Sequence, residues 1–248
     1  MSDRLRARAE SFGAAAAAYE RGRPPYPDAA VDWLLPPKGG RVLDLGAGTG
    51  KLTRQLQQRG LEVVAVEPSA GMREQLASAL PGVRLLDGTA EAIPLPASSV
   101  DAVLVAQAWH WVEPDRALPE VARVLAPGGR LGLVWNVRDE RIDWVKRLGQ
   151  TMHGDEDRRA PAPVVAHPFA TLQRHDVEWS YHTDRDGLVD LVASRSYVIT
   201  LPEPQRRAVL DDVRRLLAAH PELAGAQDIA VPYVTECYRT ELMDEAQD

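Results

Sequence analysis

The chain has 248 residues, of which 45% are hydrophobic and 26% charged, and its formal net charge is -7. This length suits one α/β domain. The acidic balance argues against nucleic acid or an anionic membrane as the main partner, because phosphate binding relies on clustered positive charge.

Cys237 is the only cysteine, which excludes an intramolecular disulfide and fits a reducing compartment. No run approaches the roughly 20 apolar residues of a membrane span, and the N-terminal region lacks the apolar core of a signal peptide, so we expect a cytoplasmic protein.

The first 36 residues predict two helices separated by a proline-rich turn. Residues 4–20 are helix formers, and the segment 23–27, RPPYP, stops that helix because proline cannot continue it. Asp28 is then expected to cap a second helix over residues 29–35.

A strand, a glycine-rich turn and a helix follow in residues 41–59. The apolar run 42–45 predicts a buried parallel strand, and a helical pattern begins at Lys51. Between them lies the sequence GAGTG, residues 46–50. Such a turn brings the backbone close to a ligand and points free N–H groups at it, so the stretch predicts a binding site.

Three motifs compete for this turn. A phosphate-binding P-loop requires glycine at position 45, where Leu45 stands, and Ser or Thr at position 52, where Leu52 stands. A dinucleotide-binding loop requires a third glycine at position 51, which is Lys51. The observed pattern is instead acidic-x-G-x-G-x-G, formed by Asp44 and the three glycines of residues 46–50. It resembles motif I of the class I S-adenosylmethionine-dependent methyltransferases; an ordinary glycine-rich turn is the alternative.

The second strand, residues 61–66, ends at Glu67. An acidic residue here can accept hydrogen bonds from both hydroxyls of a ribose. Asp44 and Glu67 would then lie at adjacent strand ends, where two carboxyl groups suit a cationic sulfonium cofactor better than a pyrophosphate. The alternative for Glu67 alone is a solvated helix cap.

Ser69 is predicted to cap a helix over residues 70–80, and a third strand spans 83–86. The turn that follows reads G-T-A-E, as in the branch of small-molecule methyltransferases akin to trans-aconitate methyltransferase. That resemblance implies that Thr89 and Ala90 contact adenine, while Glu91 supports the loop. It also implies that residues 1–36 form a lid that presents Tyr and Arg side chains to the cofactor; a surface turn with a packed tyrosine is the alternative.

The fourth strand, residues 102–105, ends in the unusual sequence AQAWHW, residues 106–111. Ligands of open parallel sheets bind at the carboxyl ends of the strands. We therefore expect His110 to face the substrate as general base or hydrogen-bond partner. Trp109 or Trp111 would form an aromatic wall able to stabilise a sulfonium by cation–π contact. Alternatively, one tryptophan belongs to the core and His110 closes a turn.

The rest of the chain alternates helices with strands. The turn L-x-P-G-G-x-L, residues 125–131, ends a helix and leads into strand five in many of these enzymes. Past residue 136 the resemblance weakens. The elements expected are helices over 116–125, 142–152, 188–200 and 204–220, and strands over 130–135, 177–182 and, antiparallel, 229–238.

Two further side chains are candidates for substrate binding. Arg195 and Tyr197 can bind a substrate carboxylate, since arginine suits planar bidentate recognition; an exposed helix face is the alternative. His153, His167 and His175 lack the spacing of a zinc site, so no metal is expected.

Together these motifs resemble a class I methyltransferase. The implied fold is α/β and Rossmann-like, with a seven-stranded, mostly parallel sheet whose last strand is reversed and with helices on both faces. The chain is interpreted as one domain: lid helices in 1–36, cofactor core in 37–136, helical substrate cap with strand six in 137–228, and last strand and tail in 229–248.

The implied function is methyl transfer from S-adenosylmethionine to the O, N or C atom of a small acceptor. A non-catalytic cofactor-binding or scaffold protein and, less favoured, an NAD-dependent oxidoreductase are the alternatives. The residues expected at the cofactor are Tyr19, Arg23, Asp44, Gly46, Ala47, Gly48, Gly50, Glu67, Pro68, Met72, Thr89, Ala90, Glu91, Ala106 and Gln107. Those expected at the substrate are Tyr26, Trp109, His110, Trp111, Trp135, Arg195 and Tyr197.

Overall fold

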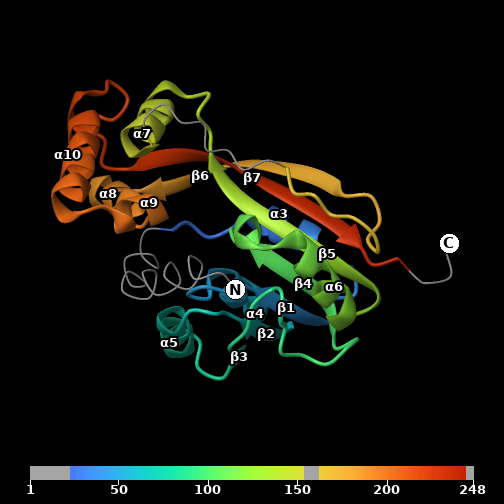
Figure 1. Cartoon of the computed structure of the whole chain (residues 1–248). Coiled ribbons are helices and arrows are strands. Elements are labelled where there is room, and N and C mark those ends of the chain that lie inside the picture. Colours follow the sequence, from blue (N-terminus) through green and yellow to red (C-terminus); the bar gives the residue numbers. More distant parts are fainter. Residues whose placement is uncertain (1–22, 154–161, 244–248) are drawn as a thin grey trace. The chain divides into compact units, whose positions relative to one another are not determined.

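The computed structural model describes residues 23–153 and 162–243 (Figure 1). Its strands form one seven-stranded sheet in the order β3-β2-β1-β4-β5-β7-β6. The pairs β1–β2, β1–β4, β2–β3 and β4–β5 are parallel. This mixed sheet with a reversed strand confirms the predicted Rossmann-like class. The predicted helix over residues 4–20 lies outside the described residues.

The elements, in chain order, are α3 (Asp28–Leu34), β1 (Arg41–Leu45), α4 (Lys51–Gln58), β2 (Glu62–Val66), α5 (Ala70–Ala79), β3 (Arg84–Leu86), β4 (Val100–Ala106), the short 3-10 helix η1 (Trp109–Trp111), α6 (Pro114–Val124), β5 (Leu125–Arg138), α7 (Asp143–His153), β6 (Gln173–Thr183), α8 (Arg185–Ala193), α9 (Ser196–Thr200), α10 (Glu203–Ala219) and β7 (Ile229–Glu241). Most lie within a few residues of their predicted bounds. No helix in the described parts of the chain is long and apolar enough to cross a membrane.

The chain divides into two compact units. We call the unit with described residues 25–136, 162–177 and 235–243 the larger unit. The smaller unit comprises described residues 23–24, 137–153 and 178–234.

In the larger unit, α3 and α4 share one apolar cluster with the sheet. Val31 and Leu34 of α3 and Leu52 and Leu56 of α4 are almost fully buried there. They pack against inward-facing residues of β1, β2, β4 and β5, including Val42. A helix that buries an apolar stripe on a sheet in this way is held mainly by packing rather than by its own propensity.

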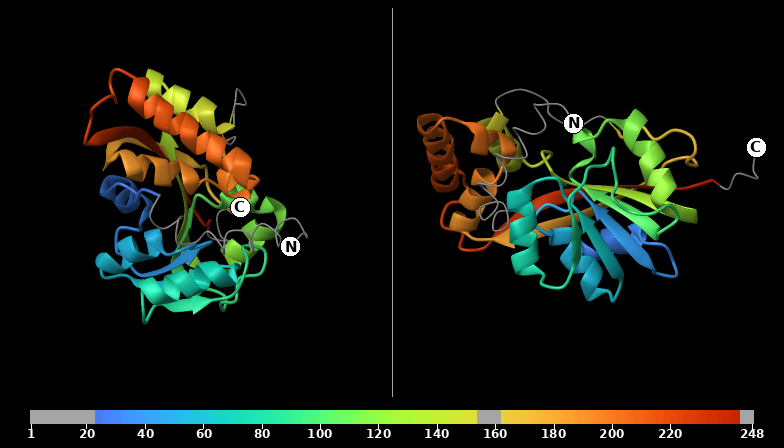
Figure 2. Two further views of the ribbon diagram at one scale, coloured as in Figure 1. Left: turned by 90° about the vertical axis from the view of Figure 1, so that its left-hand side faces the viewer. Right: turned by 60° about the horizontal axis from the view of Figure 1, so that its bottom comes forward.

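The smaller unit has its own core. Helices α7, α8, α9 and α10 gather into a bundle in which α10 contacts the other three (Figures 1 and 2). Its buried side chains include Leu148, Leu188, Leu217 and Tyr233. Over residues 176–183 the exposure of β6 alternates, which agrees with the period-two pattern expected for a half-buried strand.

Two boundaries differ from prediction because of local hydrogen bonding and register. The helix expected over 188–200 is two helices, α8 and α9. The Ser194 hydroxyl donates to the Leu191 carbonyl, and Arg195 adopts an extended ψ of 136°, which ends α8. The P-G-G turn lies within β5, where the register jumps from Val100↔Leu125 to Ala102↔Arg130 and makes a bulge.

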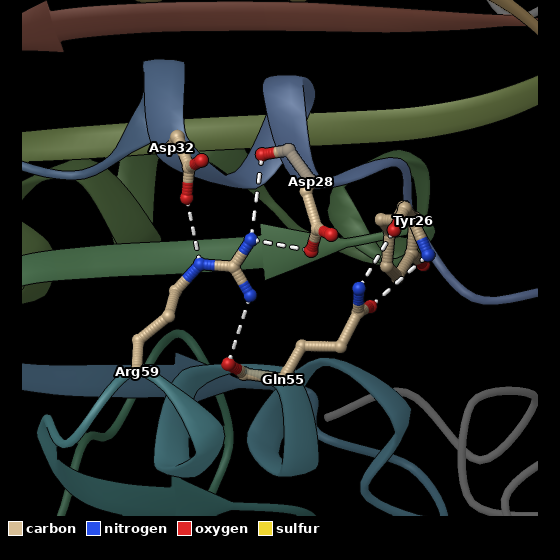
Figure 3. A network of polar contacts seen from close by, with 5 residues as sticks. All are labelled: Tyr26, Asp28, Asp32, Gln55 and Arg59. Atoms are coloured by element: carbon tan, nitrogen blue, oxygen red, sulfur yellow. Dashed lines mark hydrogen bonds and ion pairs between the residues drawn. The ribbon is translucent and has the colours of Figure 1, made fainter.

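Asp28 is not the cap that the sequence predicts. Pro27 occupies the cap position of α3, and Asp28 is the first helical residue. Its carboxylate instead pairs with Arg59 Nη2 at 2.6 Å, while Asp32 pairs with Arg59 Nε at 2.7 Å (Figure 3). Arg59 thus ties the end of α4 to α3. The cap predicted at Ser69 is confirmed, because its side chain accepts from the Met72 N–H.

Candidate functional site

The register of the larger unit places the predicted site at one edge of the sheet. Leu45 pairs with Val66, and Val66 pairs with Leu86, so the chain leaves β1, β2 and β3 at the same level. Asp44 pairs with Leu104 of β4. The glycine turn, Glu67 and the turn after β3 therefore meet at the carboxyl edge, where such sheets bind ligands.

The glycine turn needs glycine for its backbone. Gly46, Gly48 and Gly50 have φ values of 75°, 57° and 91°, in the left-handed region. The N–H groups of Gly46 and Ala47 both donate to the Val66 carbonyl, at 2.8 and 3.1 Å. A Cβ added at Gly48 would meet no atom within 4 Å, so there is open space beside the loop.

Gly50 also meets a steric limit. A Cβ there would lie 2.9 Å from Leu76 Cγ, whereas at Gly60, with a φ of 73°, it would meet nothing within 4 Å. We expect Gly50→Ala to lower the free energy of unfolding by about 3 kcal/mol, combining left-handed strain with overpacking. Gly60→Ala, the matched control, should cost only about 1 kcal/mol. Urea denaturation measures both, and equal losses would contradict the steric part of this prediction.

Glu67 holds the turn through both carboxylate oxygens. Its Oε2 accepts from the Gly48 N–H at 2.9 Å, and its Oε1 accepts from the Ser69 N–H at 2.8 Å. Burial raises the pKa of Glu67 above its ordinary value, although these two backbone hydrogen bonds oppose the rise. Each carboxylate oxygen accepts more than one hydrogen bond, so Glu67 keeps capacity for a ligand's hydroxyl groups.

Asp44 is fully buried on β1. Its Oδ2 accepts from the Thr53 hydroxyl at 2.6 Å, and its Oδ1 has no hydrogen-bond partner among the described residues. Burial raises the pKa of Asp44 to about 7; the hydrogen bond from Thr53 opposes the rise and the nearby Glu67 carboxylate adds to it. Two neighbouring buried carboxyl groups, one of them with an unpartnered oxygen, form a site that a cation would relieve.

The turn after β3 is fixed at both ends. Burial acts to raise the pKa of Glu91, but hydrogen bonds from the Glu113 N–H and from Thr89 outweigh it, so the pKa lies below its ordinary value. Glu91 thus anchors the loop, while Thr89 is half-buried and Ala90 buried. Arg73, which sequence reasoning missed, donates to the Glu67 carbonyl at 2.8 Å and pairs with Asp87.

Backbone strain marks the end of β4. Gln107 has a φ of 57°, unusual for a residue other than glycine, and such strain concentrates at functional sites. Its side-chain amide donates to the Asn136 carbonyl at 3.2 Å. Ala106, the last residue of β4, is half-buried.

The aromatic tail divides into core and surface. Trp109 is buried in η1, whereas His110 is exposed and its ring lies 4.5 Å from that of Trp111. The Trp135 indole N–H faces His110 Nδ1 at 3.5 Å, a long hydrogen bond. If Nδ1 accepts, the neutral ring carries its proton on Nε2 and is a hydrogen-bond donor there.

The remaining candidates are distributed over both units. Pro68 is half-buried and Met72 buried in the larger unit. Tyr26 is buried in the apolar cluster of α3 and α4, and Gln55 bonds both its backbone groups (Figure 3). In the smaller unit lie Arg195, which is half-buried, and Tyr197, which is exposed.

Arg23 is half-buried in the smaller unit, and Tyr19 lies outside the described residues. Asn136 was missed by sequence reasoning. Its side chain donates to the Pro25 carbonyl at 2.9 Å and accepts from the Thr235 hydroxyl at 2.7 Å. No local pattern marks its role, since both partners are about a hundred residues away.

This sheet has the class I methyltransferase fold. A family model described as a methyltransferase domain matches residues 43–133. An uncharacterized methyltransferase of Mycobacterium tuberculosis is 60% identical, over 94% of this chain and 96% of the relative. An uncharacterized methyltransferase-like protein of Schizosaccharomyces pombe is 33% identical, over 94% of this chain and 95% of that protein. A solved structure from Anaeromyxobacter dehalogenans, assigned as a type II methyltransferase, has a TM-score of 0.66 and 24% identity and covers 90% of this chain and 99% of that one.

The chain therefore belongs to the S-adenosylmethionine-dependent methyltransferases. The prediction of fold class and of methyl transfer is confirmed. Among the residues that the structure describes, no group of three or more His, Cys, Asp or Glu is arranged to hold a metal ion.

Proposed function

We propose that this methyltransferase acts on a small, acidic acceptor and is of the kind that resembles trans-aconitate methyltransferase. The observation that supports a cationic cofactor best is the buried pair of Asp44 and Glu67 beside an open glycine turn. The unpartnered Asp44 Oδ1 and the free space at Gly48 fit S-adenosylmethionine. The S-adenosylmethionine supplies an already activated methyl group.

In this proposal each residue at the sheet edge has one task. Glu67 binds the ribose hydroxyls and Asp44 faces the positively charged part of the cofactor. Thr89 and Ala90 contact the adenine. Residues that complete the cofactor site are Tyr19, Arg23, Gly46, Ala47, Gly48, Gly50, Pro68, Met72, Glu91, Ala106 and Gln107. In the larger unit, the residues proposed for the acceptor side are Tyr26, Trp109, His110, Trp111 and Trp135. In the smaller unit, Arg195 and Tyr197 are proposed to bind a substrate carboxylate.

The protein's main chemical task is then alignment of two reactants and exclusion of water. A carboxylate acceptor needs no general base, whereas a hydroxyl or an acidic carbon does. A neutral His110 whose Nδ1 accepts from Trp135 presents an N–H rather than a lone pair at Nε2. This geometry favours His110 as a hydrogen-bond donor to an anionic acceptor.

We expect His110→Ala to lower kcat/KM for an acidic acceptor about tenfold, because it removes one hydrogen bond to a charged group. His110→Asn keeps a side-chain donor and should retain more of the activity. The measurement is transfer of labelled methyl groups to acceptors found in a dicarboxylate screen. If both variants lose kcat/KM equally and by much more than tenfold, His110 acts as a general base instead.

Titration calorimetry with S-adenosylhomocysteine, with NAD in parallel, tests the cofactor assignment. We expect micromolar binding of S-adenosylhomocysteine and none of NAD. Binding of NAD alone would reject the proposed site.

We also propose that the chain works as a single methyltransferase domain in the cytoplasm and without a metal. In this arrangement residues 1–36 act as a lid and residues 137–228 as a substrate cap. The lone cysteine, Cys237, supports a reducing compartment.

A further inference from the structure

Two arginine side chains of the smaller unit meet at one buried phenol. Tyr233 on β7 is 1% exposed, and its hydroxyl lies 3.5 Å from Arg195 Nη2. Arg138, the last residue of β5, also interacts with the side chain of Tyr233. Trp179 stacks on the Tyr233 ring at 5.5 Å, which fixes the phenol in place. A rigid aromatic support therefore holds both guanidinium groups.

Arg138 lies close to a second positive charge. Burial lowers the pKa of Arg138; Tyr233 and Glu140 oppose this, and the positive charge of Arg23 adds to it. The guanidinium groups of Arg138 and Arg23 are thus close enough to repel each other, while Glu140 is a carboxylate that acts on Arg138. Burying like charges together is unfavourable unless an anion compensates them.

Arg138 and Arg141 differ in how the protein uses their side-chain donors. The Arg138 Nε is buried and has no hydrogen-bond partner among the described residues. Arg141, three positions later, is exposed and pairs with Asp139 at 2.7 Å and with Glu178 at 2.6 Å. Arginine is rarely buried without a carboxylate or another anion beside it. The donors of Arg138 are thus only partly used by the protein itself.

We propose that Arg138, Arg195 and Tyr233, with Arg23, form a binding site for the oxyanion group of a small molecule. The guanidinium fork matches carboxylate and phosphate oxygens in two parallel hydrogen bonds. All three arginines are half-buried: their Nε atoms are enclosed, while other atoms of each residue stay exposed. That this oxyanion belongs to the methyl acceptor rests on the proposed function; that the cluster binds an oxyanion does not.

The test is titration calorimetry of the full chain with three probes. Glutarate represents a carboxylate, inorganic phosphate represents a phosphate group, and glutaramide is the neutral analogue of glutarate. We expect glutarate or phosphate to bind and glutaramide to fail. The tighter of the two anions identifies the chemical source of the oxyanion. If neither anion binds, the proposal is wrong.

Variants locate the binding. Arg138→Met should weaken the affinity for the anion about tenfold or more, because it removes charge-assisted hydrogen bonds. Arg141→Met removes the same charge from the same segment outside the cluster and should leave the affinity unchanged. A similar loss in both variants would overturn the proposal, because it would indicate a general charge effect.

A conservative variant covers the case in which Arg138→Met does not fold. Tyr233→Phe keeps the ring and removes only the hydroxyl that orients the two guanidinium groups, so it should weaken anion binding several-fold. Unchanged affinity in Tyr233→Phe would overturn the proposal. S-adenosylhomocysteine is titrated into the same samples: its failure to bind wild-type protein would reject the proposed cofactor site, whatever the anions do.

Discussion

Replacing Glu67 with alanine is expected to abolish measurable binding of S-adenosylhomocysteine. The carboxylate would supply hydrogen bonds to two ribose hydroxyls, each worth roughly 1.5–3 kcal/mol for a charged acceptor, so affinity should fall about a hundredfold or more. The same change leaves the N–H groups of Gly48 and Ser69 without their acceptor. Titration calorimetry measures the affinity, and circular dichroism checks that the variant is folded.

A second substitution and a control sharpen this experiment. Glu67→Gln has the same shape but turns one acceptor into a donor, so it should also bind weakly. Glu62→Gln removes a charge from the exposed start of the same strand and should bind as the wild type does. An affinity of Glu67→Ala within threefold of the wild-type value would show that Glu67 does not bind the cofactor.

Asp44→Asn should make the unliganded protein more stable at pH 8. The pKa of Asp44 is about 7 in the folded chain and 3.8 as an ordinary value. The folded state therefore holds a proton that the unfolded chain has lost between these pH values. The contribution of Asp44 to the free energy of unfolding is therefore fully present below about pH 4. It is lost as pH rises to about 7, and the total loss is about 4 kcal/mol at most.

Unfolding by urea at several pH values tests this linkage. The gain from Asp44→Asn should be largest at pH 8, up to a few kcal/mol, and should shrink as pH falls from 7 to 4. Asp115→Asn removes the same charge at an exposed position in α6 and serves as the control. A loss of stability in Asp44→Asn at pH 8 would contradict the raised pKa.

The affinity for the cofactor should change with pH in the direction opposite to the stability that Asp44 contributes. S-adenosylhomocysteine lacks the sulfonium charge but keeps the positively charged ammonium group of the cofactor. A ligand that places this group beside Asp44 needs the carboxylate ionised, so wild-type affinity should fall as pH decreases from 8 to 6, by up to about tenfold per unit below the pKa. Asp44→Asn should bind weakly and without this pH dependence. If both proteins show the same pH profile, another group titrates at the site.

Sequence alone was sufficient for the fold class and for the position of the glycine turn. The apolar runs of β1 and β2, the pattern of Asp44 with its three glycines and the acidic end of β2 are local features, and local propensity and spacing determine them. The cap at Ser69 was predictable for the same reason. Residues further along the chain than about 136 lacked such patterns, so their roles were less clear.

Tertiary structure decided the features that depend on distant partners. Asp28 is an ion-pair partner rather than the predicted cap, because Arg59 at the end of α4 lies beside it. The raised pKa of Asp44 requires its complete burial and the proximity of Glu67, neither of which the order of residues reveals.

The meeting of Arg138 with Arg195 at Tyr233 joins three segments far apart in the sequence. Burial and charge act through space. Only the folded chain therefore shows which charged groups share a low-dielectric environment and which side chains pair with them.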